Sequence, residues 1–285
     1  MAGDSGDLNL IHLGQRARRR GFRVLELGAA GSGTSWDFAF DNEDTRSGRL
    51  EVAGDPVTTA EVAGFFVRTE REKGLKWLNW ISGVVVNRPA AVRNCAATDQ
   101  MALLSAAGFA VPSATQRCLP GRHVRVYTVA DRAFAAEISL TGEGKWFSAG
   151  TCVYQERGLP DVVAELCCRT AAREKLWIAA FDFRVTLEAG WVCIGLDPQP
   201  NFVLCERATG QPMADAILDL FEARVALRDP GTCLGNLGVG FADRDRRVLN
   251  GGPASVDGNS GIHQRSIGST NRGERIIARH LYAVS

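Results

Sequence analysis

Lysine is scarce in this chain of 285 residues, which contains 33 lysine and arginine residues in total. Only four are lysines, at positions 73, 76, 145 and 175, so arginine supplies nearly all of the positive charge. Lysine commonly supplies the point charge that binds phosphate oxygens in nucleotide sites. A phosphate site built on lysine therefore has very few candidate positions in this sequence.

Several classes of protein are excluded by other absences. The net charge is +1, so nothing indicates a surface for nucleic acids or for anionic membranes. No apolar run approaches about 18 residues, so no transmembrane helix is expected. The N-terminus, MAGDSGDLNL, lacks the basic start and apolar stretch of a secretory signal. We therefore expect no nucleic-acid partner and no membrane partner.

The eight cysteines form no C-x-x-C pair, and most lie inside apolar runs, as Cys193 does. Buried reduced thiols explain this pattern better than disulfides or zinc ligands. The sequence therefore predicts a cytoplasmic protein. The glycine-rich stretch 28–34 is not followed by the G-K-[ST] of a phosphate-binding loop, which favours an ordinary loop there.

Helices and strands are predicted to alternate along most of the chain. Residues 7–20 have apolar side chains at 8, 10, 11 and 13 and a basic end, which predicts an amphipathic helix. A glycine and the apolar strand 22–27 follow, an opening typical of α/β proteins. Further helices are predicted over 73–83, 98–107, 159–177 and 213–227, and strands over 48–52, 64–68, 84–89 and around a hairpin at 122–140.

The composition changes near residue 233. Residues 236–285 are rich in Gly, Ser, Asn and Arg and contain no Lys. Such a segment buries little apolar surface, which predicts a disordered tail over 233–285. A contact between this arginine-bearing tail and an acidic partner is the alternative.

Residues 180–202, AFDFRVTLEAGWVCIGLDPQPNF, are the most informative stretch of the chain. Two apolar runs around Gly190 predict a β-hairpin that places Asp182 and Asp197 on adjacent strands. Prolines end the second run and fix the loop that follows Asp197. Two such carboxylates can share a hard cation such as Mg²⁺. Solvated carboxylates at strand ends are the alternative interpretation.

Six segments follow one another in a recognisable order: VVVNRP at 84–89, Asn94 and Gln100 of an N-x-x-K-x-x-Q helix, GFAVPSAT at 108–115, QRCLPGRHVRVY at 116–127, AFAAEI at 133–138 and the 180–202 hairpin. Together they resemble the ATP-grasp superfamily, most closely its RimK-like branch and the ATP-grasp ribosomal-peptide maturases. The resemblance implies an α/β fold: a pre-ATP-grasp domain over 1–90, then an ATP-grasp core over 91–232 that lacks most of its lid subdomain.

The resemblance also implies a reaction and its site. Such enzymes use ATP and Mg²⁺ to convert a carboxylate to an acyl phosphate, which an amine then attacks. Arg125 matches the arginine that would hold the acyl phosphate, and Asp182 and Asp197 match metal ligands. The nucleotide-binding hinge corresponds to Gln116, Arg117, Cys118 and Leu119. The implied partner is a peptide or amino-acid substrate.

Three departures from the family pattern concern nucleotide use. Ala97 lies where the family helix N-x-x-K-x-x-Q carries a lysine. Gly195 lies where the second strand of the family hairpin carries a metal-binding glutamate. Between Thr115 and Gln116 the family has a subdomain with a second lysine and a glycine-rich lid, whereas here the two residues are adjacent. Losing such cations and a ligand carboxylate is expected to cost on the order of 10³-fold in rate.

Two main functions remain open at this stage. One is an ATP-dependent carboxylate–amine ligase with impaired nucleotide use. The other is a non-catalytic ATP-grasp-like module that delivers a peptide to a partner enzyme. For either function, the expected protein partner is a second copy of the chain in a homo-oligomer or a partner enzyme. A deletion product without a function of its own is a third alternative.

Overall fold

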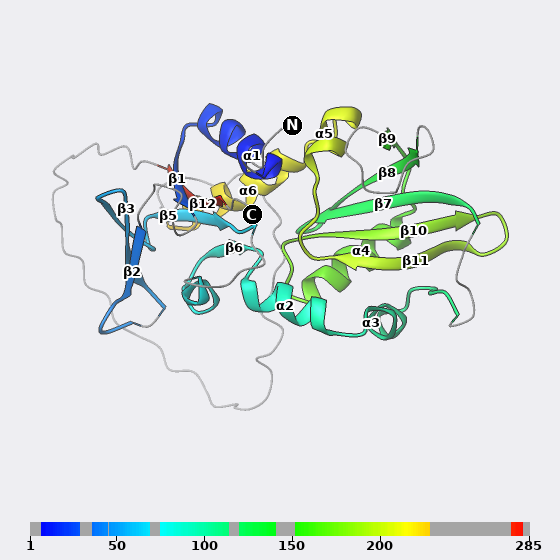
Figure 1. Cartoon of the computed structure of the whole chain (residues 1–285), viewed down its shortest axis with the longest axis horizontal. Coiled ribbons are helices and arrows are strands. Elements are labelled where there is room, and N and C mark those ends of the chain that lie inside the picture. The colour runs from blue at the N-terminus through cyan, green and yellow to red at the C-terminus, as the bar shows by residue number, and fades with distance from the viewer. Residues whose placement is uncertain are drawn as a thin grey trace, which may run out of the picture.

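The computed structural model describes residues 7–28, 36–44, 46–68, 75–113, 120–140, 152–228 and 275–281 (Figure 1). These residues form three sheets with helices packed on them. The mixture of helices and strands confirms the predicted α/β class. No helix in the described ranges is long and apolar enough to cross a membrane.

The first sheet has four parallel strands in the order β1-β12-β5-β6. They are β1 (Phe22–Gly28), β12 (Arg275–Leu281), β5 (Val62–Phe66) and β6 (Val84–Val86). The residues of β5 are all buried, as expected for an inner parallel strand with both faces covered.

Strand β12 comes from the segment 233–285, for which the sequence predicts a disordered tail. Its residues pair with β1 on one side and with β5 on the other, so β12 is an inner strand of the sheet. The tail prediction does not describe these seven residues. Residues 229–274 and 282–285 lie outside the described ranges, and there the tail stays a prediction.

A three-stranded antiparallel sheet lies beside the first one, at the left of Figure 1. It consists of β2 (Trp36–Phe40), β3 (Gly48–Val52) and β4 (Asp55–Thr58). The helix predicted over 73–83 is here only the 3-10 turn η1 (Lys76–Asn79), and residues 69–74 lie outside the described ranges. Arg88 donates to the carbonyls of Leu78, Ile81 and Gly83, which holds this segment in an irregular path.

Helices α1 (Leu8–Arg19) and α6 (Met213–Arg228) pack on the first sheet. The apolar face predicted for α1 is confirmed, since Leu10, Leu13 and Ala17 are buried. Helix α6 comes so close to β5 that a Cβ on Gly64 would overlap the ring of Phe221. Glycine at position 64 therefore permits the contact between this strand and this helix.

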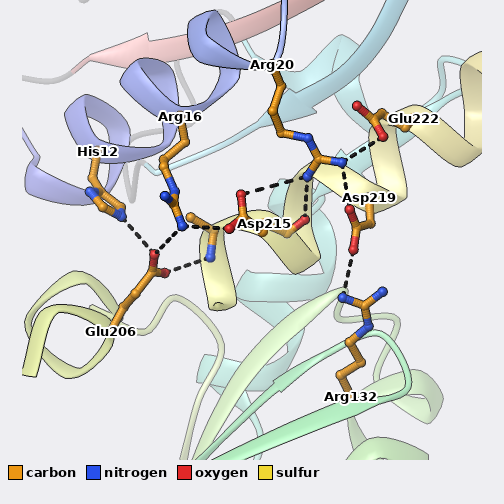
Figure 2. Close-up of polar contacts among 9 residues, drawn as sticks. His12, Arg16, Arg20, Arg132, Glu206, Asp215, Asp219 and Glu222 are labelled. Carbon is orange, nitrogen blue, oxygen red and sulfur yellow. Dashed lines mark hydrogen bonds and ion pairs between the residues drawn. The ribbon is translucent and has the colours of Figure 1, made fainter. Parts of the chain in front are cut away.

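A polar network joins α1 to α6 and to α5 (Val203–Thr209) (Figure 2). Glu206, only 7% exposed, accepts a 2.7 Å hydrogen bond from the amide of Ala214 and lies 3.0 Å from His12 Nε2. Arg20 donates to Asp219 at 2.8 Å and to Glu222 at 2.7 Å. The network is closed by further ion pairs of Arg16 with Glu206 and Asp215 and of Arg132 with Asp219.

The third sheet has five antiparallel strands in the order β11-β10-β7-β8-β9. They are β7 (Arg122–Val129), β8 (Arg132–Leu140), β9 (Cys152–Glu156), β10 (Ile178–Thr186) and β11 (Gly190–Asp197). Both predicted hairpins, 122–140 and 180–202, are confirmed as β7–β8 and β10–β11.

Three helices accompany this sheet, namely α2 (Pro89–Ala97), α3 (Gln100–Ala107) and α4 (Asp161–Arg173). The sequence predicts that the strand before α2 continues to Pro89, and the family resemblance implies a helix through Asn94 and Gln100. The strand ends at Val86, and Pro89 instead begins the helix, because its fixed φ and missing N–H suit a first turn.

The core crosses the boundary that the sequence predicts at residue 90. One buried cluster contains Leu10, Phe66 and Val86 from the first segment and Tyr127 and Phe221 from the second. The domain limits 1–90, 91–232 and 233–285 stay a prediction, but the first sheet takes strands or covering helices from all three segments.

Candidate functional site

Asp182 and Asp197 lie on the same face of the β10–β11 hairpin. Asp197 pairs with Ala180 across the two strands, and Asp182 pairs with Gly195. Because residues two apart on a strand point to the same face, the two carboxylates are near neighbours. Their side chains are 23% and 35% exposed. The predicted placement of these two residues on adjacent strands is therefore correct.

Arg125 of β7 lies between the two carboxylates. It is the direct partner of Asp182 in the β7–β10 register. Its Nη2 donates to Asp197 Oδ2 at 2.9 Å, and its Nε lies 3.3 Å from Asp182 Oδ1. The guanidinium is also 5.8 Å from the centre of the Tyr127 ring, within cation–π range. The structure thus brings together Arg125, Asp182 and Asp197, all three of which are candidate site residues in the sequence.

Charge keeps this cluster together. Burial alone lowers the pKa of Arg125, but Asp182, Tyr127 and Asp197 raise it, and the net pKa lies above its ordinary value. The guanidinium therefore stays charged at all accessible pH values. Both carboxylates are paired with this cation, so neither is merely a solvated strand end.

His123 is a member of the cluster that was not among the candidate residues of the sequence. Its Nε2 lies 2.9 Å from Asp182 Oδ1, and its side chain is 14% exposed. His123 and Arg125 are two residues apart on β7, so they share a face. The alternation of side chains along the strand HVRVY is the sequence pattern that indicates that His123 and Arg125 are neighbours.

The described residues do not form a complete metal site. They contain no group of three or more His, Cys, Asp or Glu side chains that could hold a metal ion. Gly195 faces Asp182 but carries no ligand atom, and the guanidinium of Arg125 already pairs with both carboxylates. Two carboxylates bridged by an arginine do not fit Mg²⁺ well, since Mg²⁺ demands several oxygen ligands in octahedral geometry.

The other residues matched to the family lie apart from this cluster or outside the described ranges. The N-x-x-K-x-x-Q helix is interrupted, with Asn94 in α2 and Gln100 in α3, because Asp99 caps a new helix. Gln100 binds the backbone of Leu196, donating to its carbonyl at 2.8 Å.

The predicted nucleotide hinge, Gln116, Arg117, Cys118 and Leu119, lies outside the described residues. Only 14 residues, 108–121, separate the end of α3 from the start of β7, so this segment is too short for a lid subdomain. The absence of that subdomain, first inferred from the motifs, agrees with the positions of α3 and β7.

We predict that Asp182→Asn weakens the cluster without changing cation binding. The amide loses the charge that pairs with Arg125 and His123, so the free energy of unfolding should fall by about 2 kcal/mol. Calorimetric titration with Mn²⁺ should give the same curve for the variant and the wild type. Asp161→Asn, on an exposed residue of α4, is the control. A lower Mn²⁺ affinity in Asp182→Asn alone would mean that the carboxylates do share a cation.

Comparisons with known proteins identify the fold. No protein-family model and no curated protein matches this chain. Among solved structures, the ATP-grasp ligase PsnB complexed with its minimal precursor matches with a TM-score of 0.61 and 17% identity, covering 78% of this chain and 97% of that one. The macrocyclase MdnB from Microcystis aeruginosa MRC matches with a TM-score of 0.58 and 16% identity, covering 77% and 96%.

A RiPP-associated ATP-grasp ligase from Chryseobacterium gregarium, in complex with ADP and a leader and core peptide, also matches. Its TM-score is 0.58 at 10% identity, and the match covers 75% of this chain and 93% of that one. The chain therefore has the ATP-grasp fold, in the form seen in these ligases and macrocyclases. The resemblance drawn from the sequence motifs is confirmed at the level of the fold.

Proposed function

We propose that this chain is an ATP-grasp-type carboxylate–amine ligase that acts on a peptide or amino acid and uses nucleotide poorly. The observation that carries the proposal is the cluster of Arg125, Asp182 and Asp197 on one face of the third sheet. The same fold occurs in ligases and macrocyclases whose structures contain precursor peptides. That similarity supports a peptide as the substrate.

Arg125 is the residue that would bind the acidic group of a substrate. In such ligases ATP supplies the phosphate that activates the carboxylate. Arg125 carries a permanent charge in a largely buried position, where a hydrogen bond to an anion is strong. An incoming anion would have to replace Asp182 or Asp197 on the guanidinium.

Nucleotide use is proposed to be impaired because two kinds of cation site are missing. Ala97 and the absent subdomain remove the family lysines. The two lysines in the described ranges, Lys76 in η1 and Lys175 after α4, are not on the strands that carry Arg125, Asp182 and Asp197. The described carboxylates fit Mg²⁺ poorly, so we derive no step that passes through the metal. Without a lid, water is not excluded from the site.

A non-catalytic binding module is the second candidate. It is favoured by Gly195, which faces Asp182 where the family carries a glutamate, and by the pairing of Arg125 with both carboxylates. Such a module would bind a peptide and deliver it to a partner enzyme in the cytoplasm. Both proposed functions involve binding a peptide, but only the ligase would release phosphate from ATP.

We predict weak binding of Mg·ATP, with a Kd at or above roughly 1 mM. The reason is the loss of the two lysine sites and the lid, which together hold the phosphates in the family. Isothermal titration calorimetry with Mg·ATP, with Mg²⁺ alone as the control, measures this directly. A micromolar Kd would contradict the proposed impairment and leave an ordinary ligase as the better description.

A further inference from the structure

The loop that follows Asp197 is held by side chains along its whole length. The carbonyl of Pro198 accepts from Asn87 Nδ2 at 2.7 Å. The next two carbonyls, of residues 199 and 200, both accept from Nη1 of Arg68. The carbonyl of Asn201 accepts from the Tyr127 hydroxyl at 3.2 Å. Four consecutive carbonyls of an irregular segment thus bind side chains, where solvent exposure is the usual arrangement.

Two of these donors come from the carboxyl edge of the first sheet. Arg68 follows β5 and Asn87 follows β6, and the two strands are parallel neighbours that pair Phe66 with Val86. Both side chains therefore leave the sheet at the same edge. Arg68 is 14% exposed and Asn87 is 1% exposed, so both contacts are shielded from water.

Asn87 binds both strands of the hairpin that carries the carboxylates. Its Nδ2 donates to Ile178 at the start of β10 and to Pro198 just after β11. Its Oδ1 accepts from the amides of Trp177, at 2.6 Å, and Ile178, at 3.1 Å. Every hydrogen-bonding position of this amide is used. The side chain therefore fixes the end of β11 relative to the start of β10.

A single residue, Gln199, connects Arg68 to the carboxylate of Asp197 through two hydrogen bonds. The Gln199 carbonyl accepts from Arg68, while the Gln199 amide donates to Asp197 Oδ1 at 2.9 Å. The other oxygen, Asp197 Oδ2, accepts from Arg125. Gln199 thus connects the contact made by Arg68 to the carboxylate that pairs with Arg125.

We propose that Arg68 and Asn87 are positioning residues, through which the first sheet sets the orientation of Asp197 toward Arg125. The inference deepens the proposed function, because it names what holds one carboxylate of that site. It needs neither ATP nor a peptide for its test, so its failure and the failure of the proposed function can be told apart.

The coupling energy between Arg125 and Asp197 is the decisive measurement. It is obtained from urea unfolding of Arg125→Gln, Asp197→Asn and the double variant. We expect it to fall by more than half when the cycle is repeated in an Arg68→Met background. A residue that only stabilises the junction would lower the stability of every variant equally and leave the coupling energy unchanged, which would overturn the proposal.

Arg88→Met is the matched control. Arg68 donates to two backbone carbonyls and Arg88 to three, but those of Arg88 belong to the segment 78–83 and not to the loop after Asp197. The variant should lose stability while the coupling between Arg125 and Asp197 stays at its wild-type value. Equal loss of coupling in Arg88→Met and Arg68→Met would also overturn the proposal.

A second readout applies if Arg68→Met does not fold. Arg68→Lys keeps the charge but lacks the planar fork that reaches several acceptors. Proline on both sides leaves Gln199 as the single amide between residues 198 and 200, so its hydrogen exchange can be followed alone. We expect faster exchange of this amide in Arg68→Lys and no change in Arg88→Lys. Unchanged exchange in Arg68→Lys would refute the positioning role.

Discussion

Truncation of the chain before Arg275 should abolish the folding of the first sheet. The truncation removes β12, which pairs with β1 on one side and β5 on the other. Each net backbone hydrogen bond contributes about 1 kcal/mol, and the loss of an inner strand also leaves both neighbours unpaired. The expected loss of several kcal/mol is comparable to the whole stability of an ordinary domain. Circular dichroism during urea unfolding measures it.

The control is a truncation after Leu281, which keeps all of β12. This shorter deletion should leave the unfolding midpoint unchanged. If the longer truncation also unfolds at the wild-type urea concentration, then the tail behaves as its composition predicts and β12 contributes nothing to the sheet.

The contrast between β12 and the β10–β11 hairpin shows what the sequence can predict. The hairpin depends on residues close together in the chain, since Gly190 turns it and the prolines after Asp197 end it. Strand β12 depends on partners that are distant in sequence, and it belongs to a segment, 236–285, that is rich in Gly, Ser, Asn and Arg. Local composition therefore indicates disorder where distant pairing produces a strand.

The candidate site likewise contains some contacts that a sequence pattern predicts and others that only the fold provides. Asp182 and Asp197 share a face because the pairing register of the hairpin shifts between Asp182 and Phe183, which regular alternation from the turn does not predict. Alternation along β7 does place His123 beside Arg125, although His123 was not a candidate from the sequence. By contrast, no local pattern shows that Arg68 binds the loop after β11. That contact depends on the packing of two sheets, which only the fold provides.

The choice between the two proposed functions depends on Gly195. It is the direct partner of Asp182 across the hairpin, so a side chain there would point to the same face. The heavy atom nearest to a Cβ added at this position would be Gln100 Oε1, at 4.0 Å, so the first atom of a side chain has room there. Gly195→Glu would therefore add a third carboxylate beside Asp182.

The added carboxylate should have two measurable effects. In EDTA it repels Asp182, because Arg125 already pairs with two acids, and the melting temperature should fall. With Mg²⁺ the repulsion is relieved, and the melting temperature should recover. Gly158→Glu is the matched control, since Gly158 has no atom within 4 Å of its Cβ position and Mg²⁺ should not change its melting temperature.

If the chain is a ligase with impaired nucleotide use, Gly195→Glu should raise phosphate release from Mg·ATP by on the order of tenfold, equal to about 1.4 kcal/mol of transition-state stabilisation. Arg125→Ala should remove that gain, because no cation would then bind the anion that forms.

Phosphate release is measured for the wild type, each single variant and the double variant. Release that stays at the buffer level in all four proteins would rule out the ligase. In that case the fold would remain as a scaffold for binding, and Arg125→Ala would weaken only the capture of an acidic peptide.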